Sequence, residues 1–312
     1  MPDRVPYFEE GLREDVLACW RRQGLASAAE LHRRFPSDKR ESIKFNLEPK
    51  PRLDRWPTRL ADLDRFRQQL QFSEQQRLPD DWLQRARTWR KRKHVLMLYV
   101  HQGFFLSMGV KDWRRFNDVM LLTMDNPELV RRMMQMQGEL AARLTQRLLS
   151  EVEIDAAVFS EPIGGNDRPL LSPEMYADLV LQSYTPVREV LQRHGVPVII
   201  FQTYANAALL VPGILRWGFN CLWACEVNVA AMDYRRLRRR FGRDLRLIGG
   251  IDLDALRQGK DAIKREIEAK VPPLLQQGGY VPLADGRVRE DVPFENYVYY
   301  RQLIQKITQE RA

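Results

Sequence analysis

The sequence has few cysteines and no long hydrophobic run. Its 312 residues include only Cys19, Cys221 and Cys225, an odd and sparse set that is typical of reduced thiols rather than of a disulfide framework. No stretch approaches the ~18 consecutive apolar residues that a membrane-spanning helix needs. The opening residues, 1–4, lack the apolar segment of a secretory signal. We therefore expect a cytoplasmic protein without a membrane partner.

Two patterns that bind nucleotides are also missing. No strand-like segment is followed by Gly-x-Gly-x-x-Gly, and the chain contains no Walker-type loop. These absences remove the main support for a sheet that binds a dinucleotide or a nucleoside triphosphate.

The chain is basic, with a formal net charge of +9. Its arginines are suited to bidentate contacts with carboxylates and phosphates. The densest clusters, Arg85–Lys93 and Arg235–Arg240, lie on segments with helical periodicity, where a charge run usually forms a solvated face. No nucleic-acid-binding module is recognisable. We therefore favour an acidic small molecule over nucleic acid as the ligand.

The clearest single element spans residues 196–206. A β-branched run, 196–201, ends in the polar and aromatic residues Gln202, Thr203, Tyr204 and Asn206. A continuous apolar run is typical of a strand that is buried on both faces of a parallel sheet. Ligands of such folds bind at the C-terminal strand ends, so we expect the polar tip to face a cavity.

Strand-like and helical segments alternate over the rest of the chain at intervals near 25–30 residues, which predicts parallel strands joined by right-handed crossovers. We predict strands at 94–100, 154–159, 196–203, 221–226, 245–248 and 280–283, with a weaker one at 43–47. Helices are predicted at 12–23, 27–35, 62–71, 80–91, 125–151, 172–193, 207–217, 230–241 and 260–275, and from 293 to the end. Periodicity alone fits an eight-stranded barrel with one strand unassigned and a six-stranded open sheet equally well.

The first 93 residues are the least regular part of the chain. No Gly/Ser-type linker separates them from the remainder. We therefore predict that residues 1–93 form an N-terminal helical cap on a barrel of residues 94–312, within one structural domain.

Several polar and aromatic residues follow the predicted strands, and parallel strands would gather them on one face. The candidate catalytic residues are Glu161, Asp252, Asp285 and His101, and the candidate substrate-binding residues are Tyr99, Gln202, Tyr204, Asn206, Trp223, Glu226 and Arg287. Carboxylates from different strands could transfer protons or hold a metal. Each one alone is equally well explained by ion pairs with arginines or, for Asp252, by capping of the next helix.

Three other features have a structural and a functional interpretation. His101 is either a proton shuttle or a hydrogen-bonded structural histidine. Trp223 and Tyr204 either form a flat wall for a planar ligand or pack in the core. Cys221 and Cys225 lie on the same side of a strand, but without a nearby histidine or third cysteine they favour buried thiols over zinc.

Five motifs together resemble the uroporphyrinogen decarboxylase superfamily. They are Glu161-Pro162-Ile163-Gly164-Gly165, Leu171-Ser172-Pro173-Glu174-Met175, Leu247-Ile248-Gly249-Gly250-Ile251-Asp252, Gly278-Gly279-Tyr280-Val281-Pro282 and Asp291-Val292-Pro293-Phe294-Glu295-Asn296. The resemblance implies an α/β fold, namely a distorted (β/α)8 TIM barrel with its site at the C-terminal mouth.

The sequence departs from both chemistries of that superfamily. Decarboxylases carry a segment of the type Met-Arg-Gln-Ala-Gly-Arg that binds substrate carboxylates, whereas residues 98–103 contain no arginine. Methyltransferases linked to corrinoids and thiols carry His-x-Cys and a later Cys that bind zinc. Here Gln202-Thr203-Tyr204 occupies the first position and Asp285 stands near the second. We therefore expect no metal site.

Three functions are compatible with this resemblance. The first is metal-independent methyl transfer that involves a small methylated substrate and a corrinoid carried by a partner protein, with no cofactor bound directly. The second is decarboxylation or binding of a carboxylate-rich tetrapyrrole, in which Asp252 or Glu161 orients the pyrrole N–H groups and Arg287 is a cation for the side chains. The third is a non-catalytic ligand-binding barrel.

Overall fold

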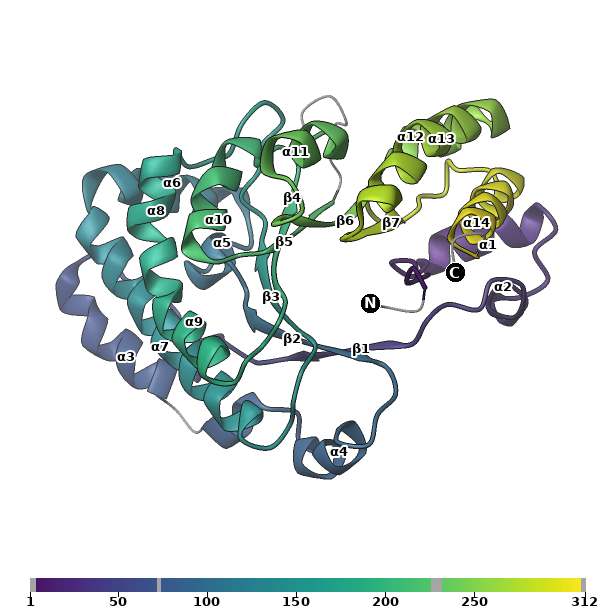
Figure 1. Cartoon of the computed structure of the whole chain (residues 1–312). Coiled ribbons are helices and arrows are strands. Elements are labelled where there is room, and N and C mark those ends of the chain that lie inside the picture. The colour runs from purple at the N-terminus through teal and green to yellow at the C-terminus, as the bar shows by residue number, and fades with distance from the viewer. Residues whose placement is uncertain (1–3, 72–73, 226–231, 310–312) are drawn as a thin grey trace. The chain divides into compact units, whose positions relative to one another are not determined.

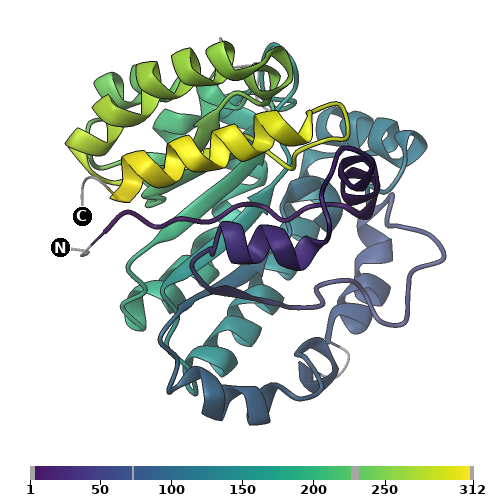
Figure 2. The same ribbon diagram turned by 90° about the vertical axis from the view of Figure 1, so that its right-hand side faces the viewer.

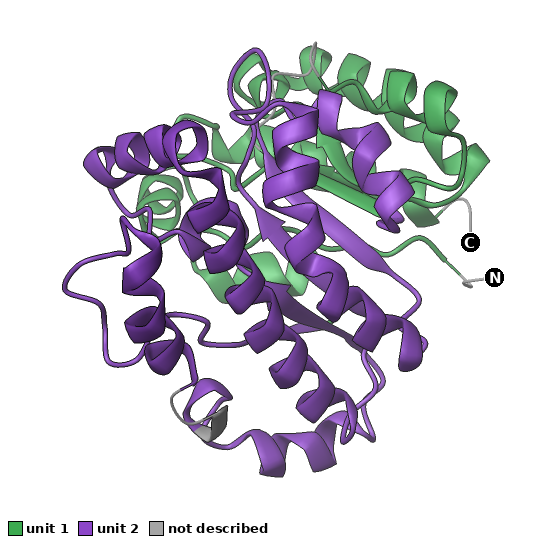
Figure 3. Cartoon of the chain, turned by 90° about the vertical axis from the view of Figure 1, so that its left-hand side faces the viewer, with its two compact units in different colours: residues 1–39, 221–312 green, residues 40–220 purple. Residues whose placement is uncertain are grey.

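The computed structural model describes residues 4–71, 74–225 and 232–309. The chain divides into two compact units, which Figure 3 shows in different colours. The terminal unit contains residues 1–39 and 221–312, and the central unit contains residues 40–220. Residues 40–93, which we assigned to a cap, are thus grouped with the segment that follows them.

The sheet of the central unit is parallel and follows the order of the chain. Its strands are β1 (Arg40–Lys44), β2 (Val95–His101), β3 (Ala156–Glu161) and β4 (Ile199–Tyr204), and each pairs with the next (Figure 1). The register shifts between Tyr99 and His101 of β2. Because side chains alternate between the two faces of a strand, this irregularity decides which face each of these two residues occupies.

Helices of the central unit cover one face of this sheet. They are η1 (Leu60–Asp62), α3 (Leu63–Gln71), η2 (Glu74–Arg77), α4 (Trp82–Trp89), α5 (Phe104–Ser107), α6 (Trp113–Asp125), α7 (Pro127–Leu149), α8 (Pro173–Leu179), η3 (Leu181–Tyr184), α9 (Thr185–Arg193), η4 (Ala208–Leu210) and α10 (Val211–Trp217). Asn126 caps α7 and Ser172 caps α8, each followed by proline at the first helical position. Phe159 of β3 packs against Tyr184 and Trp217 of the helix layer.

The terminal unit contains three further parallel strands. Its strands β5 (Cys221–Cys225), β6 (Arg246–Ile251) and β7 (Tyr280–Ala284) also pair in chain order. Its helices are α1 (Glu14–Arg22), α2 (Ala28–Arg34), α11 (Tyr234–Phe241), α12 (Leu253–Gln258), α13 (Lys260–Gln277) and α14 (Phe294–Gln309).

The two ends of the chain pack together within the terminal unit. Trp20 of α1 is fully buried, its ring centroid lies 4.7 Å from that of Tyr297 in α14, and its indole N–H donates to the Val292 carbonyl at 2.8 Å. Arg301 of α14 donates to the Tyr7 hydroxyl at 2.7 Å. Figure 2 shows the N-terminal segment running beside α14. These contacts make the N-terminal residues part of the core of this unit.

The alternation of parallel strands and helices confirms the predicted α/β class, and the chain is a distorted TIM barrel. Each predicted strand is present, although the one predicted at 43–47 lies at 40–44. The part of the chain that the structure describes contains seven strands, so it supplies no eighth strand. Among the same residues, no helix is long and apolar enough to cross a membrane.

Three local predictions are wrong. Between the strand predicted at 94–100 and the helix predicted at 125–151 we predicted no helix, but the structure has α5 and α6 there. The helix predicted at 172–193 is interrupted, because Val180 leaves regular α-helical geometry and η3 separates α8 from α9. The short helix α12 was not predicted, and Asp252 caps it.

Candidate active site

The predicted site residues are divided between the two units. The central unit contains Tyr99, His101, Glu161, Gln202, Tyr204 and Asn206, and the terminal unit contains Trp223, Asp252, Asp285 and Arg287. Glu226 lies outside the described residues.

Glu161, at the end of β3, is fully buried against the helix layer. The Tyr176 hydroxyl of α8 donates to its Oε2 at 3.1 Å, and the Tyr184 hydroxyl donates to the same oxygen. The Phe104 backbone N–H donates to Oε1 at 2.8 Å. Burial raises the pKa of Glu161 to about 7, although these three hydrogen bonds favour the ionised form. The carboxyl group therefore links β3 to two helical segments and to the turn after β2.

His101 is buried on the same side of the sheet. Its Nδ1 accepts a hydrogen bond from the Gly103 N–H at 3.0 Å, and its ring centroid lies 4.5 Å from that of Tyr184. Burial lowers the pKa of His101 to about 3, so the ring is neutral near pH 7. Because Nδ1 accepts, we assign the proton to Nε2, which is buried and has no hydrogen-bond partner among the described residues.

The turn between His101 and Phe104 requires glycine at position 103. Gly103 has φ +84° and ψ 175°, a region that is essentially restricted to glycine. A Cβ atom there would collide with the Ser160 carbonyl oxygen and lie 2.8 Å from Oε1 of Glu161. The turn is therefore held in one conformation, and Gln102 is the residue that it presents to a pocket.

The opposite face of the sheet carries a different set of side chains. Ser160 pairs in register with Gln202, and Tyr99 with Val158. Since Phe159 faces the helices, these pairs lie on the other face. Glu161 and Gln202 therefore leave the sheet on opposite sides, as do His101 and Tyr99. Gln202 is buried, whereas the Tyr204 side chain is 37% exposed.

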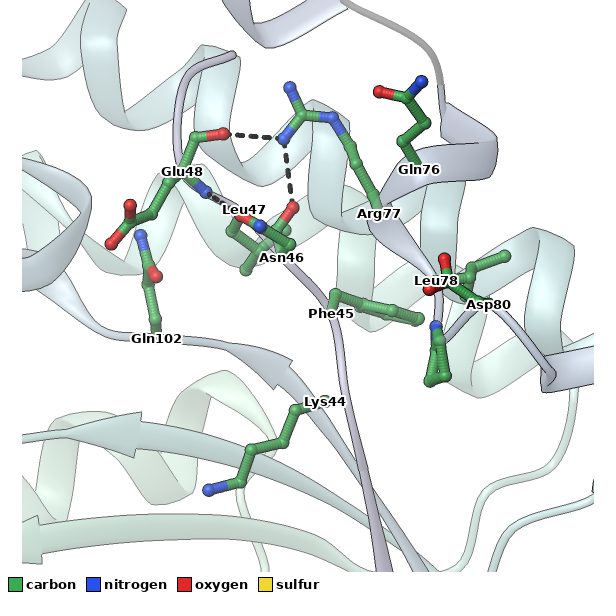
Figure 4. A pocket seen from close by; sticks show the side chains of 11 residues that line it. Lys44, Phe45, Asn46, Leu47, Glu48, Gln76, Arg77, Leu78, Asp80 and Gln102 are labelled. Carbon is green, nitrogen blue, oxygen red and sulfur yellow. Dashed lines mark hydrogen bonds between the residues drawn. The ribbon is translucent and has the colours of Figure 1, made fainter. Parts of the chain in front are cut away.

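A pocket of about 610 Å³ lies at the ends of β1 and β2. Its walls are residues 44–48 and 76–80 with Gln102, and Figure 4 shows Lys44 at the end of β1 and Gln102 just beyond the end of β2. The exposed Lys44 places its ammonium group 4.7 Å from the centre of the Tyr99 ring. Lys44 is not among the candidates predicted from the sequence, although apolar and polar residues alternate over 43–47 and this pattern places Lys44 on the predicted strand.

Arg77 forms one wall of this pocket. Its Nη1 donates to the carbonyls of Asn46 at 3.0 Å and Glu48 at 2.8 Å, and its Nη2 donates to the carbonyls of Gln69 and Leu70. The guanidinium group thus holds backbone segments together. Lys44 is the cation of the pocket whose charge is available to a ligand.

Within the terminal unit, the structure brings Asp252 and Asp285 close together. Asp252 caps α12 by accepting from the Asp254 N–H at 2.9 Å, and Asp285 accepts from the Leu253 N–H at 3.4 Å. Burial raises the pKa of Asp252, and Lys270 and Arg257 oppose this effect.

The other two candidates of the terminal unit differ in exposure. Trp223 is buried in β5, and Arg287 is exposed in the loop after β7. The roles assigned to all of the candidates stay predictions.

The described parts of the chain contain no group of three or more His, Cys, Asp or Glu side chains that could hold a metal ion. Cys221 and Cys225 are both buried. Burial raises the pKa of Cys221 to about 12, so its thiol is protonated near pH 7. Protonated thiols are poor metal ligands and poor nucleophiles.

The model of the uroporphyrinogen decarboxylase (URO-D) family matches residues 105–299. Because the match covers more than half of the chain, the protein belongs to this family, which confirms the resemblance found in the sequence. It is therefore a barrel protein of an enzyme family.

Solved structures show more distant likenesses. A protein described as a vitamin-B12-independent methionine synthase, from Listeria monocytogenes, is 12% identical with a TM-score of 0.38, over 69% of this chain and 65% of that chain. A β-mannanase from Bacteroides ovatus is 14% identical with a TM-score of 0.39, over 72% of each chain. No curated protein matches the sequence. The family assignment thus depends on the sequence match.

The substitution Gly103→Ala should destabilise the protein more than Gly195→Ala does. Both glycines have positive φ, but a Cβ atom at Gly195 meets nothing within 4 Å, so that variant carries only backbone strain of roughly 1–2 kcal/mol. Gly103→Ala adds the collision with β3, and we expect an additional loss of at least ~1 kcal/mol. Urea unfolding of both variants measures the difference. Equal losses would show that the turn relaxes without cost.

The ionisation of Glu161 should make stability depend on pH. Its pKa is raised on folding from 4.5 to about 7, so the stabilisation is complete below pH 4.5 and is lost as the pH rises through about 7. We expect a loss on the order of 3 kcal/mol. Glu161→Gln should remove this dependence, whereas the exposed Glu153→Gln should retain it. The measurement is urea unfolding between pH 4 and pH 8, and an unchanged slope in Glu161→Gln would contradict the assignment.

Proposed function

We propose that the protein is a carboxy-lyase of the URO-D family whose substrate is a small molecule with several carboxylate groups. The observation that carries this proposal is the Lys44 ammonium group beside the Tyr99 ring, at the edge of the pocket lined by Gln102. An ammonium group over an aromatic face is attracted to the ring and keeps its remaining donors for an anion. This arrangement suits a ligand that is both acidic and planar.

The carboxylates around Lys44 do not neutralise it. Lys111 forms an ion pair with Glu48, and Glu41 interacts with Arg85 at 3.1 Å and His94 at 3.2 Å. No ion pair joins Lys44 to any other residue in the described ranges. Residues 98–103 lack the arginine of the decarboxylase segment, and in our proposal Lys44 supplies the cation that this segment would otherwise provide.

In the proposed reaction, a carboxylate leaves the substrate as CO2. The electron pair of the broken C–C bond stays on the substrate carbon, which then takes up a proton. Lys44 binds a neighbouring carboxylate, and Gln102 and Tyr204 offer hydrogen bonds at the strand ends. Glu161 and His101 face the helix layer, so in this proposal they position the turn that carries Gln102. For the candidates of the terminal unit we keep the roles predicted from the sequence, which are catalysis for Asp252 and Asp285 and substrate binding for Arg287.

Metal-independent methyl transfer is a second candidate. It is supported by the end of β4, where a buried Gln202 and an exposed Tyr204 stand at the position of the His-x-Cys zinc ligands of methyltransferases. Such a surface could hold a methylated small molecule by hydrogen bonds and aromatic contact. The methyl group would pass to a corrinoid on a partner protein, and the protein itself would bind no cofactor.

The variant Lys44→Met should weaken the binding of uroporphyrin I, a carboxylate-rich tetrapyrrole, at least tenfold, about 1.4 kcal/mol. Lys44→Arg should retain binding because the charge remains. Lys93→Met is the matched control, since Lys93 is an exposed lysine of the same unit that lies before the other end of β2. Fluorescence titration measures the affinity, and CO2 release from uroporphyrinogen III measures turnover.

The outcomes separate the two candidate reactions. Affinity that is unaffected by Lys44→Met contradicts the role of Lys44. A protein that neither binds uroporphyrin I nor releases CO2 contradicts the decarboxylase proposal. Methylation of added cob(I)alamin by a methylated donor would then support methyl transfer.

A further inference from the structure

A second pocket lies within the terminal unit, on the outer face of α14. Its volume is about 310 Å³. Phe294, Val298, Tyr299 and Gln302 of α14 line it, and Arg34 comes from the end of α2. Residues at this helical spacing lie on one side of a helix. Pockets that hold small molecules have volumes of about 300–1,000 Å³, so this one has room for a small ligand.

The apolar floor of this pocket is held in a fixed position. Phe294 begins α14, and its backbone N–H donates to the Gln23 side chain at 2.7 Å. The Phe294 ring centroid lies 5.6 Å from that of Trp20, which is fully buried. The start of α14 is thereby anchored in the core, while Val298 and Tyr299 remain half-buried at the surface. A floor that is ordered before the ligand arrives loses little conformational entropy on binding.

The pocket contains one cation whose charge no carboxylate offsets. Lys260 and Glu295 both line the pocket and pair with each other at 2.9 Å. Arg34 forms no ion pair with any residue in the parts of the chain that the structure describes. Its guanidinium carbon lies 5.5 Å from the centre of the ring of Phe35, which is buried. An arginine held over an aromatic ring is partly ordered and keeps its N–H donors for a ligand.

The position of Arg34 in its helix explains part of this charge. His32, Arg33 and Arg34 form the last turn of α2, where cations interact favourably with the helix dipole. That effect acts on Arg33 and Arg34 alike. Arg34 lines the pocket and Arg33 does not, so the neighbouring arginine is a matched control for a role in binding.

We propose that this pocket binds a small carboxylate that carries an aromatic ring. The ring covers Phe294, Val298 and Tyr299, and the carboxylate accepts two N–H groups of Arg34, whose planar fork matches it. The amide group of Gln302 offers a further hydrogen bond. An uncharged aromatic molecule would leave the guanidinium group unpaired, and an inorganic anion would leave the apolar floor in water. The proposal is independent of the reaction proposed above, because the two pockets share no residue.

Three probes test the chemistry of the ligand. Hydrocinnamate has a ring and a carboxylate, whereas hydrocinnamyl alcohol lacks the charge and propionate lacks the ring. Ligand-observed NMR titration of the full chain should give a dissociation constant on the order of 1 mM for hydrocinnamate. The other two probes should each bind at least tenfold more weakly. Equal affinity for the alcohol would show that the charge of Arg34 has no part in binding.

Two pairs of variants test the position of the site. Arg34→Gln should weaken hydrocinnamate binding at least tenfold, because the charge-assisted hydrogen bonds are lost, and Arg33→Gln should leave it unchanged. Val298→Trp should abolish binding because the indole group fills the pocket. Gln309→Trp places the same group at the exposed end of α14, outside the pocket, and should have no effect. Circular dichroism checks that each variant is folded.

The variant Lys44→Met distinguishes this pocket from the one in the central unit, and it should leave hydrocinnamate binding unchanged. Three results would overturn the proposal. They are a native chain that shows no saturable binding of hydrocinnamate, an affinity that Arg34→Gln lowers no more than Arg33→Gln does, and binding that is lost in Lys44→Met but retained in Val298→Trp.

Discussion

The central unit depends on the hydrogen bonds of one buried carboxyl group. Glu161 accepts from two tyrosine hydroxyls of the helix layer and from the backbone of the turn after β2. A buried group with three donors fixes the relative positions of the segments that supply them. The pocket residue Gln102 lies on that turn, so the shape of the pocket is set from the opposite face of the sheet.

Most of the fold could be predicted from the sequence, because the strands are short apolar runs with strong β propensity. The strand predicted at 196–203 and the others needed only small changes of their ends. The elements that were missed lack such a pattern. In α6 the apolar residues face outward as well as inward, so the usual contrast between a polar and an apolar face is weak. The break at Val180 depends on tertiary packing, which periodicity does not record.

The candidate site was less predictable, because one residue of difference along a strand moves a side chain to the other face. The rule that polar strand ends gather at one mouth selected Glu161 and His101 together with Gln202 and Tyr99. It could not tell that the first two face the helices. Lys44 was missed for a related reason, because a charged residue in a short alternating strand is interpreted as solvent-exposed. Its place over the Tyr99 ring, which suggests a ligand-binding role, is known only from the structure.

The register shift between Tyr99 and His101 has a consequence for how this site can change during evolution. Without it, residues two apart would share a face, and a new ligand-contacting residue at one position would alter the packing at the other. With it, Tyr99 belongs to the pocket side and His101 to the core. Substitutions that change ligand preference are thereby separated from those that threaten folding, so this strand end can diverge in sequence while the barrel is preserved.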